Sequence, residues 1–340
     1  MDEQNPVFAH QKKTVEALSP FFTSITVFTN EKSNTPLPTN VQVYIVPWSK
    51  SSKIANIYRI LANVIPYLYR NQSSIVFCHM TDLQSALISP FTLLFRMKHV
   101  LWYAHRHNSI YLIFASFFVS KIVSSTVGSC RLGFNRKKIT YINQGIEEQD
   151  FTFVKRAQPS TEEILYFGRL DKSKNIHIFF ELFKALEKSH LKLNIDLYGA
   201  TTNLKSKLYI DGLRSEYNHL LKDGSVNIMG PISRNNISLV SRRYDLFVNL
   251  FFGSLDKALI EATMLGLPVV TWNEEYCNQF GTWSNKKPIQ TLDFILEEIR
   301  GIKLLKNAQF QSELNRRLDL AIKLHGFQGW TLRMIENLIQ

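Results

Sequence analysis

The chain has 340 residues, of which 45% are hydrophobic and 20% are charged. This length favours two domains, and the balance excludes disordered, collagen-like and coiled-coil proteins. Cys78, Cys130 and Cys277 lie far apart without paired spacing. That spacing excludes a disulfide framework or thiolate zinc site and favours a reducing, cytoplasmic compartment. The longest apolar stretch, residues 110–119, is shorter than the roughly 20 residues that span a bilayer, and the polar N-terminus does not resemble a signal peptide.

The net charge of +12 is concentrated in the first half of the chain. Residues 53–138 contain eleven lysines and arginines but only one acidic residue, Asp82. The aromatic residues of this half include Tyr67, Tyr69, Trp102 and Tyr103. A basic, aromatic-rich segment indicates an anionic partner, such as a phospholipid surface, a lipid diphosphate or a nucleic acid. The alternative is a solvated basic face with no partner.

Short runs of β-branched and aromatic residues alternate with helix-like stretches along the chain. Strands are predicted at residues 24–29, 41–46, 75–78, 100–104, 122–125, 139–142, 164–167, 193–198, 226–229, 246–250 and 268–272. Near-continuous apolar strands separated by helices are typical of parallel sheets covered on both faces, so two doubly wound α/β domains facing a cleft are expected. Residues 151–161 lose periodicity and are the expected linker, whereas the tail, residues 292–340, predicts two or three amphipathic helices.

The ends of two predicted strands carry residues suited to phosphate. Gly168 follows the strand at 164–167 and permits a sharp turn, and it precedes Arg169 and Lys174, two cations that can converge on one anion. An ordinary charged surface loop explains this spacing equally well.

The second of these strand ends leads into a predicted helix. Ser254 and Asp256 are candidate N-caps, and Gly266 stands where a left-handed C-cap belongs. The N-terminus of this helix would offer free N–H groups to a phosphate. Glu261 lies within the apolar part of the helix, where a carboxylate must accept from backbone groups or bind ligand hydroxyls.

These segments, in order and spacing, resemble the retaining GT-B glycosyltransferases of the group 1 type (CAZy family four), which build bacterial surface glycans. The resemblance covers residues 6–330 and is strongest in the second half. Its motifs are GRLDKSK at 168–174, LYG at 197–199, VNIMG at 226–230 and SLDKALIEATMLGLPVV at 254–270, with VLWYAH at 100–105 and YINQGI at 141–146 in the first half. It implies an N-terminal acceptor domain (1–155), a C-terminal nucleotide-sugar domain (160–326) and a terminal helix (327–340) that packs back on the first domain.

The resemblance also assigns roles to individual residues. Arg169 and Lys174 would neutralise the departing diphosphate, and His105 would reach the transferred sugar, which makes these the expected catalytic residues. Glu261 would bind the ribose hydroxyls. The other expected donor-binding residues are Gly145, Gly168, Gly230, Ile232, Gly253, Ser254, Leu255, Asp256, Lys257 and Ala258. Preorganised cations and amide dipoles supply this chemistry, so no metal and no cofactor beyond the donor, a UDP-, GDP- or ADP-sugar, is expected.

Two departures from the family pattern stand out. The family has two glutamates eight positions apart in this segment. The second corresponds to Glu261, whereas the position of the first is occupied by Gly253 in this chain. The family also opens with a strand and a glycine loop, whereas this chain begins at the residues expected after that strand, so the first strand of the N-terminal domain is expected to be missing.

The predicted function is transfer of a hexose, with retention of configuration, to a hydroxyl of a lipid-linked or oligosaccharide acceptor. The expected location is the cytoplasm or the inner face of the plasma membrane, with Tyr67, Tyr69, Trp102 and Tyr103 on the anionic surface. The alternative is a GT-B protein that binds nucleotide sugar or a partner without turnover. No nucleic-acid motif is recognisable, so a nucleic-acid partner is not expected.

Overall fold

The computed structural model describes residues 9–31, 36–48, 52–187 and 193–340. The chain divides into two compact units. The first is Met1–Asn143 with Gln328–Gln340, and the second is Gln144–Phe327. Residues 1–8, which include the segment expected to follow the missing first strand, lie outside the described residues.

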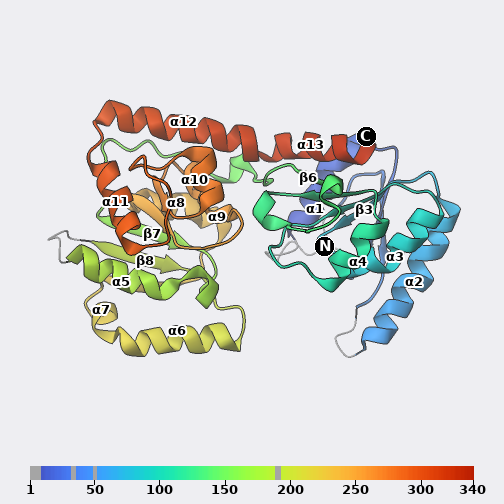
Figure 1. The fold of residues 1–340 in the computed structure, drawn as a ribbon, viewed down its shortest axis with the longest axis horizontal. Helices are drawn as coiled ribbons and strands as arrows, with labels where there is room; N and C mark the ends of the chain where they lie inside the picture. The colour runs from blue at the N-terminus through green and yellow to red at the C-terminus, as the bar shows by residue number, and fades with distance from the viewer. Residues whose placement is uncertain (1–8, 32–35, 49–51, 188–192) are drawn as a thin grey trace. The chain divides into compact units, whose positions relative to one another are not determined.

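The first unit is an α/β structure with two parallel sheets (Figure 1). Strands β3, β4, β5 and β6 form one sheet in that order, and β1 and β2 form the other. The strands are β1 (Ile25–Thr29), β2 (Val41–Ile45), β3 (Val76–His79), β4 (His99–Trp102), β5 (Lys121–Ser124) and β6 (Ile139–Tyr141). The helices are α1 (Ala9–Leu18), α2 (Lys53–Arg70), α3 (Asp82–Leu94), α4 (Ile110–Phe118) and α13 (Phe327–Ile339).

The two faces of the four-stranded sheet are covered by different helices. Leu101 belongs to a core shared with α2, α3 and α4. Its neighbour Trp102 points to the other face, where its ring meets that of Trp330 on α13 at 5.3 Å between centroids. The C-terminal helix therefore completes the first unit, and Arg333 ties it there by donating to the carbonyl of Ile142.

A buried histidine joins β4 to α3 in this unit. His99 is fully buried, and its two ring nitrogens lie 3.1 Å from Ser85 Oγ and 3.0 Å from Thr92 Oγ1. Burial lowers the pKa of His99 from 6.5 to about 3, because the charged ring would lose its hydration. The imidazole is thus a structural group at neutral pH.

We expect acid to destabilise this unit through His99. The unfolded chain takes up a proton below pH 6.5 that the folded ring refuses until about pH 3. The contribution of His99 is therefore present above pH 6.5 and is lost as pH falls, by up to about 1.4 kcal/mol per unit. Urea unfolding as a function of pH should show a shallower decline for His99→Gln, whereas the exposed control His219→Gln should follow the parent. A parallel decline in all three proteins would contradict this assignment.

The second unit is a doubly wound α/β domain. Its strands are β7 (Glu163–Phe167), β8 (Asn194–Tyr198), β9 (Val226–Gly230), β10 (Leu246–Asn249) and β11 (Val269–Thr271). Its helices are α5 (Ile176–Glu187), α6 (Leu204–Glu216), α7 (Asn218–Lys222), α8 (Arg234–Val240), α9 (Lys257–Met264), α10 (Glu274–Phe280), α11 (Leu292–Lys303) and α12 (Asn307–His325). All strand pairs are parallel, in the order β11-β10-β7-β8-β9. The chain changes winding direction between β7 and β10, so their carboxyl ends form the topological switch point.

Successive residues of β7 enter different cores. Ile164 and Tyr166 pack with α5, α6, α11 and α12 on one face. Leu165 and Phe167 pack with α8, α9 and α10 on the other. This explains why the strand is apolar throughout, since alternate side chains of a strand point to opposite faces and both are covered here.

The predicted elements agree with the structure in number and position. All eleven predicted strands are present among the described residues, with ends that differ by one or two positions. Three helices, α11 to α13, form the tail. The expected linker at residues 151–161 lies within the second unit, where both its backbone and a side chain are bound. Val154 N donates to the carbonyl of Leu265, and the Arg156 guanidinium donates to the carbonyls of Ser241 and Tyr244. In the described part of the chain, no helix combines the length and apolar character needed to cross a membrane.

Candidate functional site at the switch point of the second unit

Two glycines in close contact, Gly168 and Gly199, begin the loops after β7 and β8. Gly168 N donates to the carbonyl of Tyr198, and Gly199 N donates to that of Gly230. A Cβ atom on Gly199 would lie 1.9 Å from the carbonyl oxygen of Gly168, so only glycine fits there. Tyr166 supports the loop from below, because its hydroxyl donates to the carbonyl of Arg169 at 2.9 Å. Burial raises the pKa of Tyr166 well above its ordinary value, which keeps the hydroxyl protonated for this bond.

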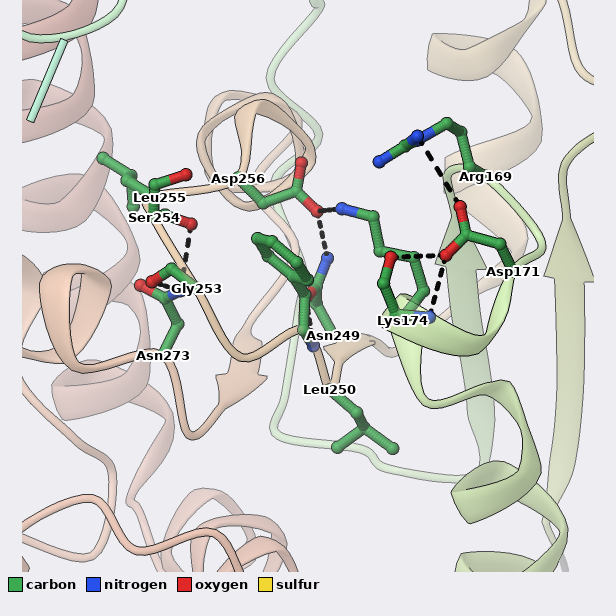
Figure 2. Close-up of polar contacts among 12 residues, drawn as sticks. Arg169, Asp171, Lys174, Asn249, Leu250, Gly253, Ser254, Leu255, Asp256 and Asn273 are labelled. Atoms are coloured by element: carbon green, nitrogen blue, oxygen red, sulfur yellow. Dashed lines mark hydrogen bonds and ion pairs between the residues drawn. The ribbon is translucent and has the colours of Figure 1, made fainter. Parts of the chain in front are cut away.

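Lys174 is the buried cation of the site. It ends the short helical turn Lys172–Lys174, which Asp171 caps by accepting from Ser173 N at 2.9 Å. Its Nζ lies 2.5 Å from Asp256 Oδ2 (Figure 2). The same Nζ lies 3.8 Å from the centre of the Phe251 ring. The side chain is only 7% exposed, compared with 59% for Arg169.

Arg169 lies on the same loop, and its side chain is exposed to solvent. Its Nη1 lies 3.7 Å from Asp171 Oδ2, and its side chain extends from the loop toward the region of Asp256 (Figure 2). The buried Lys174 and the exposed Arg169 therefore belong to the same loop at the switch point. An exposed guanidinium can turn toward a ligand at little cost, whereas the lysine is already held.

The loop after β10 supplies the other half of the site. Asn249 is fully buried, donates to Asp256 Oδ2 at 3.1 Å and accepts from Phe251 N at 3.0 Å. Asn175, in a left-handed conformation, fastens the first loop to the second by donating to the carbonyl of Leu250 at 2.7 Å. Because β7 and β10 are neighbours in the sheet, their loops meet although they are distant in sequence.

Asp256 precedes α9 but does not cap it. The residue occupies the N-cap position with no side-chain hydrogen bond to the helix, because its carboxylate is bound to Lys174 and Asn249 instead. The prediction that its side chain caps the helix is therefore wrong. The first-turn N–H groups of α9 carry no side-chain cap, which leaves them suited to an anion.

Gly253 lies beneath an aromatic ring. A Cβ atom at this position would come within 2.5 Å of Cζ of Phe251. The carboxylate that the family pattern has here could be accommodated only if Phe251 moved, so the glycine and the phenylalanine are linked. The same ring lies over the ammonium group of Lys174.

Neighbouring side chains fix the backbone from Gly253 to Leu255. Asn273 Nδ2 donates to the carbonyls of Gly253 and Ser254 at 3.4 and 3.3 Å. Leu255 N donates to Glu275 Oε2 at 2.6 Å, so this N–H is occupied in the structure. Gln144, which precedes Gly145, donates to the carbonyl of Leu255 at 3.1 Å.

Glu261 is paired with an arginine that sequence reasoning missed. Arg234 Nη2 lies 3.3 Å from Glu261 Oε1, and Arg234 Nε lies 3.0 Å from Asp150 Oδ2. Burial raises the pKa of the Glu261 carboxyl, while Arg234 and Lys257 act in the opposite direction. The sequence predicted that the Glu261 carboxylate accepts from backbone groups or binds ligand hydroxyls. The structure adds the Arg234 guanidinium as a partner of this carboxylate.

The remaining predicted donor residues lie in the second unit, and His105 lies in the first. Gly230 ends β9 with φ of +78°, and Ile232 packs against the core beneath α9. Ala258 is buried in the first turn of α9, whereas the Lys257 side chain is exposed. His105 follows β4, is exposed, and has its ring 5.7 Å from that of Tyr103.

The residues that sequence reasoning missed are Asn249, Phe251, Asn175 and Arg234. Asn249 follows an otherwise apolar strand and is buried, a signal that could have identified it. The pairing of Arg234 with Glu261 has no signal in the sequence. Among the described residues, no group of three or more His, Cys, Asp and Glu side chains could hold a metal ion.

Residues 147–280 match the family model described as glycosyl transferases group 1. The matched segment contains both loops of the switch point and helix α9. The match confirms the predicted resemblance to group 1 glycosyltransferases over these residues. No curated protein matches the chain by sequence.

Solved structures of similar fold cover nearly the whole chain. HepE of Anabaena, solved in complex with UDP, is 14% identical with a TM-score of 0.71, and the likeness covers 96% of this chain and 95% of that one. A glycosyltransferase from Rickettsia africae is 11% identical with a TM-score of 0.73, over 99% and 96%. The lipopolysaccharide outer core galactosyltransferase WaaB, in its apo form, is 12% identical with a TM-score of 0.68, over 98% and 96%. The predicted GT-B fold is confirmed.

Proposed function

We propose that this protein is a glycosyltransferase that moves a hexose from a nucleoside diphosphate sugar to a hydroxyl group of a glycan acceptor, with retention of configuration. The observation that carries the proposal is the switch point of the second unit, where Lys174 and Arg169 flank the start of α9. The family match and the complex of HepE with UDP support a UDP-sugar among the three donor classes.

The site residues act mainly on the leaving group. When the bond between the sugar C1 and the diphosphate oxygen breaks, the nucleoside diphosphate gains negative charge. Lys174 and Arg169 neutralise that charge, and the N–H groups of α9 add a favourable dipole. The acceptor oxygen forms the new bond to C1 on the face that the diphosphate leaves, and its proton passes to the departing phosphate or to solvent. These side chains stabilise the developing charge without a metal ion.

The resemblance to the family supports the other proposed donor contacts. Glu261 would accept from the ribose hydroxyls, the backbone at Gly230 and Ile232 would meet the nucleobase, and His105 would contact the sugar. The acceptor is a lipid-linked or free oligosaccharide, bound by the first unit. The excess of lysine and arginine in residues 53–138 of the first unit favours an anionic membrane surface as the place where the protein acts.

A second candidate is a GT-B protein that binds nucleotide sugar without turnover. The observation in its favour is Gly253, which lacks the family's carboxylate at a position that the Phe251 ring covers. Such a protein would hold the diphosphate through Lys174 and Arg169, but its grip on the sugar hydroxyls would be weaker.

Incubation with UDP-, GDP- and ADP-hexoses separates the two candidates. Release of nucleoside diphosphate that increases with an oligosaccharide acceptor and persists in EDTA supports the enzyme and its independence of metal. Saturable binding of the donor without release supports the second candidate. Neither binding nor release of any donor would overturn both.

Replacement of Glu261 by alanine is expected to weaken donor binding. A hydrogen bond to a charged group is worth about 1.5–3 kcal/mol, so Kd for the nucleotide sugar should rise by about 10- to 100-fold. Calorimetry measures this, with Glu297→Ala as the control, because Glu297 pairs with Lys286 at an exposed position. A lower melting temperature with unchanged Kd would show that Glu261 serves only as the partner of Arg234.

Neutralisation of Asp256 is expected to tighten the binding of nucleoside diphosphate. Its carboxylate lies at the start of α9 and repels an incoming anion, whereas Asn at this position can still accept a hydrogen bond from Lys174. We expect Asp256→Asn to lower Kd for UDP by about tenfold, a gain of roughly 1.4 kcal/mol. Weaker binding would mean that the charge of Asp256 is needed to hold Lys174 in place.

A further inference from the structure

Helix α4 of the first unit, labelled in Figure 1, has apolar side chains that are exposed to solvent. Ile110, Tyr111, Phe114 and Phe117 on this helix are between 44% and 73% exposed. Their spacing places them on one side of the helix, since positions three and four residues apart share a face. Surface helices normally direct charged or polar side chains outward, so the face is inverted.

The exposed face is not needed to hold the helix in place. Leu112, Ala115 and Ser116 on the opposite side are fully buried against the first unit. Ser109 caps the helix by accepting from Leu112 N at 3.0 Å. The outward residues therefore gain little from folding, and single exposed apolar residues are common but a contiguous set marks an interaction surface.

A basic segment lies alongside this helix and extends its apolar face. The ring of Phe134 stacks on Phe117 with 5.4 Å between centroids. Asn135 donates to the carbonyl of Ser116, and Lys138 donates to the carbonyls of Ser116, Phe117 and Val119. The exposed cations of the segment are Arg131, Arg136 and Lys137.

We propose that the α4 face, defined as Ile110, Tyr111, Phe114, Phe117 and Phe134, docks on an anionic lipid bilayer. The aromatic and aliphatic side chains would enter the boundary of headgroups and acyl chains, while Arg131, Arg136 and Lys137 would meet the lipid phosphates. Charge complementarity selects this partner, because residues 53–138 carry eleven cations and one acid. The rings of Phe117 and Phe134 stack on each other, so these two faces are not free to stack on nucleic-acid bases. This arrangement favours a lipid bilayer over a nucleic acid as the partner.

This surface differs from the one predicted from the sequence. Trp102 and Tyr103 are only 5% and 4% exposed, because they pack within the first unit, so they cannot contact a membrane. Docking depends on the α4 face and on the neighbouring Arg131, Arg136 and Lys137. Its purpose, to bring the site to a lipid-linked acceptor, rests on the proposed function.

Flotation with liposomes tests the docking surface. Equimolar phosphatidylcholine and phosphatidylglycerol vesicles should carry the wild-type protein, and pure phosphatidylcholine vesicles should carry much less. Phe114→Asp/Phe117→Asp should lower the partition coefficient more than about tenfold, since both rings lose their burial in lipid. The matched control is Leu204→Asp/Leu208→Asp on α6, an apolar pair in the second unit that is more exposed than Phe114 and Phe117 and should float like the wild type.

The cations are tested separately. Arg131→Gln/Arg136→Gln/Lys137→Gln should lower binding to the anionic vesicles and remove most of its salt dependence. Circular dichroism and melting temperature show that each variant is folded. Equal flotation of the wild type and the Phe114/Phe117 variant would overturn the proposal. So would a wild-type oligomer that these substitutions dissociate, because the face would then bind a second copy.

Failure of this proposal is distinguishable from failure of the proposed function. Release of nucleoside diphosphate with a soluble oligosaccharide acceptor does not require a bilayer. The Phe114/Phe117 variant should therefore keep that activity while losing flotation and losing turnover of a vesicle-borne acceptor.

Discussion

Replacement of Lys174 by methionine should lower kcat/KM for the nucleotide sugar by about 100- to 1,000-fold, the range expected when a preorganised charge-stabilising group is lost. The ammonium group is buried at the switch point and lies beside Asp256 at the start of α9. In the proposed reaction, negative charge develops there on the departing diphosphate. Methionine keeps an aliphatic stem against Phe251 and removes only the charge. Initial rates of nucleoside diphosphate release measure the effect.

Two further proteins separate this role from a structural one. Lys172→Ala changes an exposed lysine of the same helical turn and should stay within about threefold of the parent. The double variant Lys174→Met/Asp256→Asn removes the unpaired carboxylate that the single variant leaves behind. It should regain stability without regaining activity. Recovery of activity in the double variant would show that Lys174 only neutralises Asp256.

Arg169→Ala should act in the same direction with little loss of stability. Its guanidinium is largely exposed, and its ion pair with Asp171, at 3.7 Å, contributes little to stability. We expect lower turnover with an unchanged unfolding transition. An unchanged rate in both Arg169→Ala and Lys174→Met would exclude the mechanism.

Replacement of Gly199 by alanine should destabilise the second unit by about 3 kcal/mol or more, an effect at the upper end for overpacking. The new Cβ would lie 1.9 Å from the carbonyl oxygen of Gly168 and 3.0 Å from Cγ of Leu170. The clash involves backbone, so the loop after β7 must shift. Because that loop carries Arg169, the displacement should also weaken the binding of nucleoside diphosphate.

The control for this variant is Gly212→Ala. Gly212 lies in α6, and a Cβ atom there meets nothing within 4 Å. Alanine favours a helix over glycine by about 1 kcal/mol, so this variant should be slightly more stable than the parent. Urea unfolding measures both. Equal free energies of unfolding for the two variants would contradict the prediction, because the loops at Gly168 and Gly199 would then move apart at little cost.

The local pattern of the sequence determined the secondary structure and half of the site. Strands buried on both faces, such as β4 and β10, are rich in apolar residues, and the partly exposed β1 and β2 are rich in β-branched and aromatic residues, so all eleven strands are visible without coordinates. The glycine turn, Arg169, Lys174 and the helix after residue 256 are also local, because each depends on residue types at short spacing.

Only the tertiary structure decided which of these residues meet. Lys174 reaches Asp256, and Asn175 reaches Leu250, because β10 lies beside β7, an order set by the direction of two crossovers rather than by composition. The pairing of Glu261 with Arg234 has the same origin. Which aromatic residues face solvent was likewise a matter of packing, since an apolar sequence looks the same whether a helix or water covers it. Trp102 is covered by Trp330, whereas nothing in the described chain covers Phe117 to the same extent.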